Sequence, residues 1–197
     1  FADFKKHQIL FMKKLCLLLV VCANQFMFSQ DFTPEKSFFS GQIGLFGMYV
    51  NHELRLSNQF VLKSEVGLDF FSTDNNDLDF KALAPVITLE PRWYYNLNKR
   101  GNAGKNVTHN GGNFVSITSS YHPDWFVITN AEGTNFVIHQ LAIVPKWGIK
   151  RNFGTSNFNY ELGAGLGYNI RFLKHYGFAE NDGQVYIDLH ARIGYSF

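Results

Sequence analysis

The feature that most constrains the fold of this 197-residue chain is a regular alternation of apolar and polar side chains. It is clearest in the segment FNYELGAGLGYNIRF, residues 158–172. Every even position there is aromatic or aliphatic, and every odd position is Asn, Glu, Gly or Arg. Successive side chains of a β-strand point to opposite faces, so a period of two predicts a strand with one apolar and one polar face.

Segments of the same kind recur between residues 31 and 197, and no helical period stands out. They predict strands near residues 39–47, 49–57, 60–72, 81–96, 112–128, 135–151, 157–172 and 184–197. An even number of strands returns both chain ends to the same side of a closed barrel. We therefore expect an all-β fold, a closed antiparallel up-and-down β-barrel of about eight strands.

Two details of this strand pattern remain open at the level of sequence. The apolar positions change parity between Ile43 and Met48, which indicates either a tight turn near Gly47 or a β-bulge in one long strand. Pro85, Pro91 and Pro145 fall within predicted strands, and each requires a bulge or a local loss of ladder hydrogen bonds.

Residues 1–30 have a different character. The stretch MKKLCLLLVVCANQFMFSQ, residues 12–30, begins with two lysines, continues with an apolar run and ends near a Ser-Gln pair, which predicts a secretory signal peptide. The apolar run is shorter than the roughly 20 residues that span a bilayer as a helix. We interpret residues 1–11 as an upstream extension. The expected domains are therefore the extension plus signal at 1–30 and the barrel at 31–197.

The composition of the predicted barrel domain narrows its chemistry. Both cysteines, Cys16 and Cys22, lie in the signal, so residues 31–197 have no disulfide, thiolate metal site or cysteine nucleophile. Residues 1–30 also hold four of the 18 Lys and Arg residues and one of the 16 Asp and Glu residues, which leaves 14 against 15. This balance gives no indication of a nucleic-acid partner.

Alternation by itself does not decide which face lies inside, because a lipocalin-like barrel and a membrane barrel have opposite arrangements. Three features favour the membrane barrel. The polar face is nearly charge-balanced, and it carries glycines at 163, 165 and 167 that suit a crowded interior. Aromatic residues gather on the apolar face at the same end of several strands, which is typical of an interfacial girdle. The predicted girdle is Phe60, Trp93, Tyr95, Trp147, Phe158, Tyr160 and Tyr195.

An unpaired buried charge is costly, so the charged residues of the polar face are expected to form an interior ion-pair network. These are Glu53, Arg55, Lys63, Glu65, Asp69, Glu90, Arg92, Lys146, Lys150, Glu161, Arg171, Asp188, His190 and Arg192. Eight strands leave an interior just wide enough for side chains, so we expect the network to plug the barrel. An ion pathway or a lipid-modifying active site are the alternative interpretations of the same residues.

The last predicted strand carries a resemblance to a known class. Its segment ARIGYSF, with Ile193, Tyr195 and Phe197, resembles the C-terminal aromatic signal that the assembly machinery reads in outer-membrane β-barrel proteins. Residues 36–197 resemble the small eight-stranded barrels of the OmpA, OmpX and OmpW kind, and LEPRWYYNLNKR (89–100) resembles an uncharacterised group of outer-membrane barrel-domain proteins. The resemblance implies a location in the outer membrane of a Gram-negative envelope. It also implies membrane lipids and the barrel-assembly machinery as partners, and Phe197 as the assembly signal.

The resemblance brings no catalytic residue or ligand, because a fold does not define a function. A hydrolase needs Ser, His and a carboxylate close together. None of His122, His139 and His190 has a spacing to a serine and an acidic residue that indicates such a triad. No metal-site spacing and no cofactor motif is present. We therefore expect a non-enzymatic protein with a structural or interaction role in the outer membrane. The alternatives are a narrow, porin-like channel for ions or small solutes and a lipid-modifying enzyme.

The longest predicted connection, NLNKRGNAGKNVTHNGG (96–112), lies on the same side of the barrel as the two chain ends. It contains Lys99, Arg100 and Lys105. Its Asn, Gly and Lys content predicts a solvated loop. The alternative is a contact with a periplasmic partner or with acidic lipid headgroups.

Overall fold

The computed structural model of the protein describes residues 32–75, 78–130 and 138–197. The chain divides into two compact units, Phe1–Asp31 and Phe32–Phe197, and the second contains the whole described fold. The predicted signal peptide and extension lie outside the described residues. So does the beginning of the strand predicted at 135–151.

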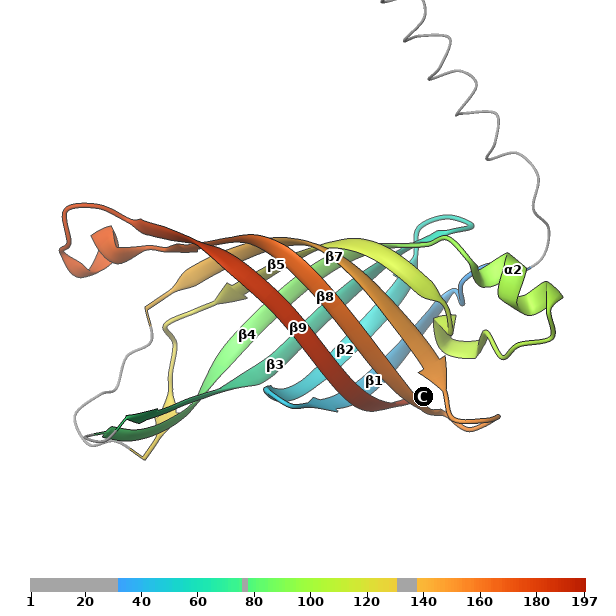
Figure 1. Ribbon diagram of the computed structural model, residues 1–197, viewed down its shortest axis with the longest axis horizontal. Helices are drawn as coiled ribbons and strands as arrows, with labels where there is room; N and C mark the ends of the chain where they lie inside the picture. Colours follow the sequence, from blue (N-terminus) through green and yellow to red (C-terminus); the bar gives the residue numbers. More distant parts are fainter. Residues whose placement is uncertain (1–31, 76–77, 131–137) are drawn as a thin grey trace, which may run out of the picture. The chain divides into compact units, whose positions relative to one another are not determined.

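The second unit is a closed barrel of eight long antiparallel strands (Figure 1). They are β1 (Ser37–Gly44), β2 (Gly47–Arg55), β3 (Phe60–Asn75), β4 (Leu78–Tyr94), β5 (Asn113–His122), β7 (Gln140–Asn152), β8 (Phe158–Arg171) and β9 (Asp182–Ser196). A two-residue segment, β6 (Ile128–Thr129), adds to the edge of β4 beyond β5. Each long strand pairs with the next, and β9 pairs with β1 to close the ring. This confirms the predicted all-β, up-and-down barrel.

Three short helical segments lie in the connections: α2 (Leu97–Asn102), η1 (Thr108–Asn110) and η2 (Leu173–Tyr176). Among the described residues, no helix has the length and apolar character needed to cross a membrane.

The first hairpin resolves the parity change seen in the sequence. Gly44 of β1 lies opposite Gly47 of β2, so the two strands are joined by a two-residue turn and no bulge is present. Ile43 and Met48 are then direct cross-strand neighbours, and both are exposed on the outer face, at 71% and 52% of their surface. A two-residue turn changes the parity of the outward positions from odd to even.

The prolines interrupt hydrogen-bond ladders and leave the register intact. The β4–β5 pairing has no partners at 90 and 91, and the β7–β8 pairing has none at 144 and 145, yet the register on both sides is the same. The strand predicted at 112–128 ends at His122 because Pro123 follows, and pairing resumes only at β6. Proline has no N–H to donate, so ladder bonds are lost at these points.

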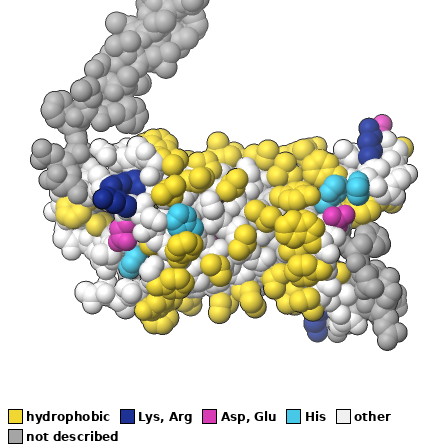
Figure 2. Space-filling view, turned by 180° about the vertical axis from the view of Figure 1, so that it is seen from behind, with side chains coloured by type: hydrophobic (Ala, Val, Ile, Leu, Met, Phe, Trp, Pro, Cys, Tyr) yellow, Lys and Arg dark blue, Asp and Glu magenta, His cyan; other side chains and the backbone are white. Residues whose placement is uncertain are grey.

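The two faces of the wall have opposite character. Outward positions of β9, such as Val185, Ile187 and Leu189, expose 61–71% of their apolar surface, and similar residues cover the other strands. In Figure 2 apolar side chains extend along the barrel, while Lys, Arg, Asp and Glu appear toward its two ends. Inward positions carry buried Ser, Thr, Asn, Glu, Lys and Arg side chains. The barrel therefore has an apolar outside and a polar inside.

Candidate functional site

The centre of the barrel interior is organised around Arg92 of β4. Its guanidinium donates two parallel hydrogen bonds to Glu161 of β8, at 2.8 and 2.6 Å, and a third to Glu90 at 2.7 Å. It also lies over the ring of Phe114, 4.1 Å from the centroid. The side chains of Arg92 and Glu161 have no exposed surface. A bidentate Arg–carboxylate pair is among the strongest charge-assisted contacts in proteins.

Two lysines extend this central cluster. Lys150 Nζ lies 2.7 Å from Glu53 Oε1, and both side chains are fully buried. Lys63 Nζ lies 2.9 Å from Glu65 Oε2 and 3.6 Å from Glu161 Oε1. These contacts join side chains from β2, β3, β4, β7 and β8. Each buried charge therefore has an opposite charge close by, as a low-dielectric interior requires.

Two of the predicted network residues lie elsewhere. Arg55, at the end of β2, donates to Thr33 Oγ1 and to the carbonyl of Pro34. Arg171, at the end of β8, pairs with Asp182 near the opposite end of the barrel, and its side chain is 37% exposed. Both have the parity of inward positions, but parity does not reveal how close a residue is to a strand end. Their inclusion in the interior network is therefore corrected.

The long connection between β4 and β5 packs against the end of the barrel. Asn110 of η1 is buried and donates from Nδ2 to Glu53 Oε2, at 2.7 Å, so the connection contacts the ion cluster directly. Its side-chain Oδ1 accepts from the backbone N–H of Glu35, and the Glu35 carboxylate accepts from the N–H of His109. The connection is therefore anchored at Asn110, whereas residues 102–105 are exposed, as expected of a solvated loop.

A small apolar layer lies beneath this connection. Leu97 of α2 is 3% exposed and packs with Val61, Tyr94 and Phe114, with Val107 against the group. Arg100 donates to the carbonyls of Gly111 and Asn106. These hydrogen bonds join α2 to the second half of the same connection. We call residues 96–112 the terminal cap, since they cover the barrel end where both chain termini of the unit lie.

The other half of the interior is hollow. A cavity of about 520 Å³ lies between the ion cluster and the barrel end opposite the terminal cap. Its deeper lining is charged and includes Glu65, Glu90, Lys146 and Arg192. This volume lies within the range of small-molecule sites, roughly 300–1,000 Å³.

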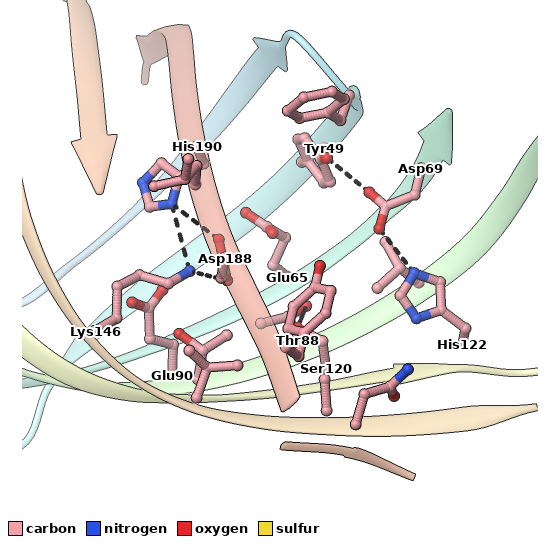
Figure 3. A pocket seen from close by; sticks show the side chains of 18 of the residues that line it. Tyr49, Glu65, Asp69, Thr88, Glu90, Ser120, His122, Lys146, Asp188 and His190 are labelled. Carbon is pink, nitrogen blue, oxygen red and sulfur yellow. Dashed lines mark hydrogen bonds and ion pairs between the residues drawn. The ribbon is translucent and has the colours of Figure 1, made fainter. Parts of the chain in front are cut away.

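Two groups of side chains face each other across this cavity (Figure 3). On one side Asp69 accepts from the Tyr49 hydroxyl at 2.6 Å and contacts His122 Nε2 at 2.7 Å. On the other side Lys146 pairs with Asp188 at 2.6 Å, and its Nζ lies 3.4 Å from His190 Nδ1. The Thr88 and Ser120 hydroxyls share a hydrogen bond of 3.0 Å between these groups.

Three polar atoms of the lining have no hydrogen-bond partner. They are Thr118 Oγ1, Asn169 Oδ1 and His190 Nε2, the last of which lies 3.3 Å from Glu161 Oε1. Thr118 and Asn169 are only 3% and 5% exposed. Buried polar atoms are normally paired, so unpaired ones on a cavity wall mark positions where a ligand or water would bind. Nothing in the sequence distinguishes these residues from other inward Thr and Asn residues.

A glycine makes room for one of the cavity histidines. A Cβ at Gly163 of β8 would lie 2.4 Å from Cε1 of His190, its cross-strand partner on β9. In the same way Gly67 of β3 accommodates the ring of Tyr49, at 2.4 Å from an added Cβ. At these two glycines a neighbouring ring occupies the space that a side chain would take, whereas Gly165 and Gly167 lie against Val144 and the backbone of β7.

The predicted girdle residues lie on the outer face near the terminal cap. Phe60 stacks on Trp93 at 6.4 Å, and Phe158 meets Tyr195 edge-on at 5.0 Å. The Trp147 indole donates to the Tyr95 hydroxyl at 2.8 Å. Tyr160 packs against Phe153, and Phe197 lies beside Tyr195.

The opposite end carries aromatic residues that the sequence reasoning missed. His139 packs against Phe172 and His175, with ring centroids 4.9 Å apart in both cases. Trp125, Phe126 and Phe178, in the β5–β6 and β8–β9 connections, are 48–68% exposed. They lie in connections, where the alternation that identified the girdle is absent.

The described residues contain few arrangements with catalytic geometry. Ser37 Oγ lies 2.6 Å from His52 Nε2 on the outer face, but no described carboxylate contacts His52. This supplies two of the three groups of a serine hydrolase. In the part of the chain that the structure describes, no group of three or more His, Cys, Asp or Glu side chains is placed to hold a metal ion.

Comparisons with protein-family models, with curated proteins and with solved structures found no match to this chain.

Proposed function

We propose that the protein is a bacterial outer-membrane β-barrel whose interior is closed to ions and solutes, with a structural or interaction role in that membrane. The observation that carries the proposal is the combination of an apolar outer wall with a buried ion cluster that joins strands on opposite sides of the barrel. A small eight-stranded barrel is compatible with this location.

The outer wall supports a lipid environment. Ile43, Val50, Val66, Leu166 and Leu189 each expose more than half of their surface, from five different strands. A water-soluble protein rarely exposes a contiguous apolar surface of this kind, whereas a membrane barrel requires it. The girdle at the capped end supplies the amphipathic rings that lie at a membrane–water interface.

Two layers support a closed interior. The first is the ion cluster, in which Glu53, Arg92 and Lys150 have no exposed side-chain surface. The second is the terminal cap, whose Asn110 contacts Glu53 from below. The cavity ends above the cluster, and its lining includes neither Glu53 nor Lys150. A solute that entered the cavity would have to separate buried ion pairs to pass further.

Location is tested by cell fractionation and electrophoresis. We expect the protein in the outer-membrane fraction, and a change in gel position between heated and unheated samples. Recovery as a soluble periplasmic protein would overturn the membrane proposal.

Closure is tested by planar-bilayer recording on the same folded preparation. We expect no steady conductance from the wild-type protein. A stable open conductance would overturn the closed interior in favour of a narrow channel. Crosslinking in intact cells, with identification of the captured neighbours, then tests the interaction role.

A further inference from the structure

The barrel wall is incomplete beside the cavity. β9 pairs with β1 only from Gly44↔Arg192 to Ser40↔Ser196, while its pairing with β8 continues to Asp182. β3 likewise pairs with β2 only up to Asp69 and continues beside β4 to Asn75. The β1–β2 hairpin is therefore shorter and stops before the far ends of β9 and β3, which extend further to the left in Figure 1. No described strand lies between these two ends. We call this opening the lateral gap.

The cavity extends into the lateral gap. Its lining includes Phe46, at the turn of the short hairpin, whose carbonyl accepts from the N–H of Phe70 on β3. It also includes Phe70, Ile187 and Leu189, which have outward parity on their strands and are 40–65% exposed. A cavity lined by both inward and outward residues opens through the wall. The mouth is thus apolar on both sides.

One carboxylate in the polar part of the cavity has no Lys or Arg partner. Its two full cations are already paired, Lys146 with Asp188 and Arg192 with Glu65, at 2.6 and 2.7 Å. Glu90 is paired with Arg92. Asp69 is the only cavity carboxylate without a Lys or Arg partner among the described residues. Its partners are the Tyr49 hydroxyl and the His122 ring.

Two of the unpaired wall atoms have the same preference. Thr118 Oγ1 and Asn169 Oδ1 have no partner, and the Asn169 amide already donates to Gln140. The amide oxygen is therefore a free acceptor, and a hydroxyl accepts as readily as it donates. N–H donors and a positive charge are therefore the ligand groups that complement these two atoms and the Asp69 carboxylate.

We propose that this cavity binds a single-chain amphiphile with an ammonium head group. The head group lies near Asp69, Thr118 and Asn169, and the chain leaves through the lateral gap between Phe46, Phe70 and Ile187. The ring of Phe71, beside His122, adds an aromatic surface that favours a cation. Entry of the ligand from the lipid side rests on the proposed membrane location, but binding to the folded barrel does not.

The test compares three probes that share one chain length. Dodecylammonium, dodecanol and dodecanoate are titrated at about pH 8 into the folded barrel in non-ionic micelles, by calorimetry and by native mass spectrometry. We expect one dodecylammonium per barrel, bound at least tenfold more tightly than the other two. Equal or tighter binding of dodecanoate, or no binding at all, would overturn the proposal.

Variants then locate the site. Asp69→Asn is expected to weaken dodecylammonium at least tenfold while leaving dodecanol unchanged. Asp182→Asn, which removes an acid at the same end of the barrel but outside the cavity lining, is the matched control and should bind as wild type. An unchanged affinity in Asp69→Asn would overturn the assignment.

A second variant keeps the test independent of Asp69. Ala142 is 6% exposed and lines the cavity, so Ala142→Phe fills space without removing a charge. It should abolish binding of every probe while the heat-dependent gel shift persists. Retained binding in this variant would place the ligand elsewhere. Because these measurements need only a folded barrel, their outcome is separate from that of fractionation and conductance.

Discussion

Lys150 of β7 and Glu53 of β2 belong to strands on opposite sides of the eight-strand ring, and their charged atoms lie 2.7 Å apart. Each strand is four places from the other in either direction around the barrel. Side chains therefore span the whole interior at this level. Since both are fully buried, neither charge has access to bulk water as an alternative partner.

This pair gives a stability prediction. Glu53→Ala leaves Lys150 and Asn110 without their shared partner, and truncation of one member of a buried pair costs on the order of 3–5 kcal/mol. We expect a clear drop in the urea midpoint of the micelle-folded protein. In the double variant Glu53→Ala/Lys150→Met much of the loss should be recovered, because no uncompensated charge remains. Additive effects of the two changes would contradict a direct coupling.

The terminal cap gives a prediction about the barrel end. Asn110→Asp places a carboxylate where the amide now donates to Glu53, so two negative charges meet in a buried site. We expect faster proteolysis within residues 96–112 at neutral pH. Asn102→Asp, at an exposed position of α2, makes the same substitution without this contact and is the control. Equal cleavage of both variants would show that the amide does not hold the cap.

The contact between Gly163 and His190 predicts that a second substitution, at His190, partly reverses the effect of the first, at Gly163. Gly163→Ala forces the imidazole away from its place, and overpacking of this kind costs about 1–3 kcal/mol. Gly41→Ala adds the same methyl group where no atom lies within 4 Å and should be tolerated. Adding His190→Ala to Gly163→Ala should restore part of the denaturant midpoint. A midpoint that falls further would locate the strain in the backbone instead.

One pH dependence follows from the end opposite the cap. The Tyr176 hydroxyl donates to Asp124 Oδ2 at 2.7 Å and holds the pKa of that carboxyl below its usual value. A lowered folded-state pKa means that the contact contributes fully above the ordinary Asp pKa of about 3.9 and is lost as the pH falls through the lowered value. Protection from hydrogen exchange in residues 124–127, after correction for the intrinsic pH dependence of exchange, should therefore be high at pH 6 and low near pH 3. In Tyr176→Phe the exchange rates, corrected for intrinsic pH effects, should lose this transition.

Local sequence determined the strands and their faces. A period of two is a property of neighbouring residues, so the segment around Leu162 and Leu166 predicts its outward positions without knowledge of any partner strand. The even strand count, the polar interior and the girdle around Trp93 follow from the same pattern. The exposed apolar positions of the structure agree with this orientation.

Tertiary structure decided which side chains meet and where the interior is closed or hollow. Alternation assigns Arg55 and Arg171 to the inward face but carries no information on depth along the barrel, so both were placed in a network from which they are absent. The register of the short first hairpin leaves the lateral gap, and the Asn110–Glu53 contact closes the opposite end. Both depend on residues far apart in the chain, and only closure of the ring brings them together.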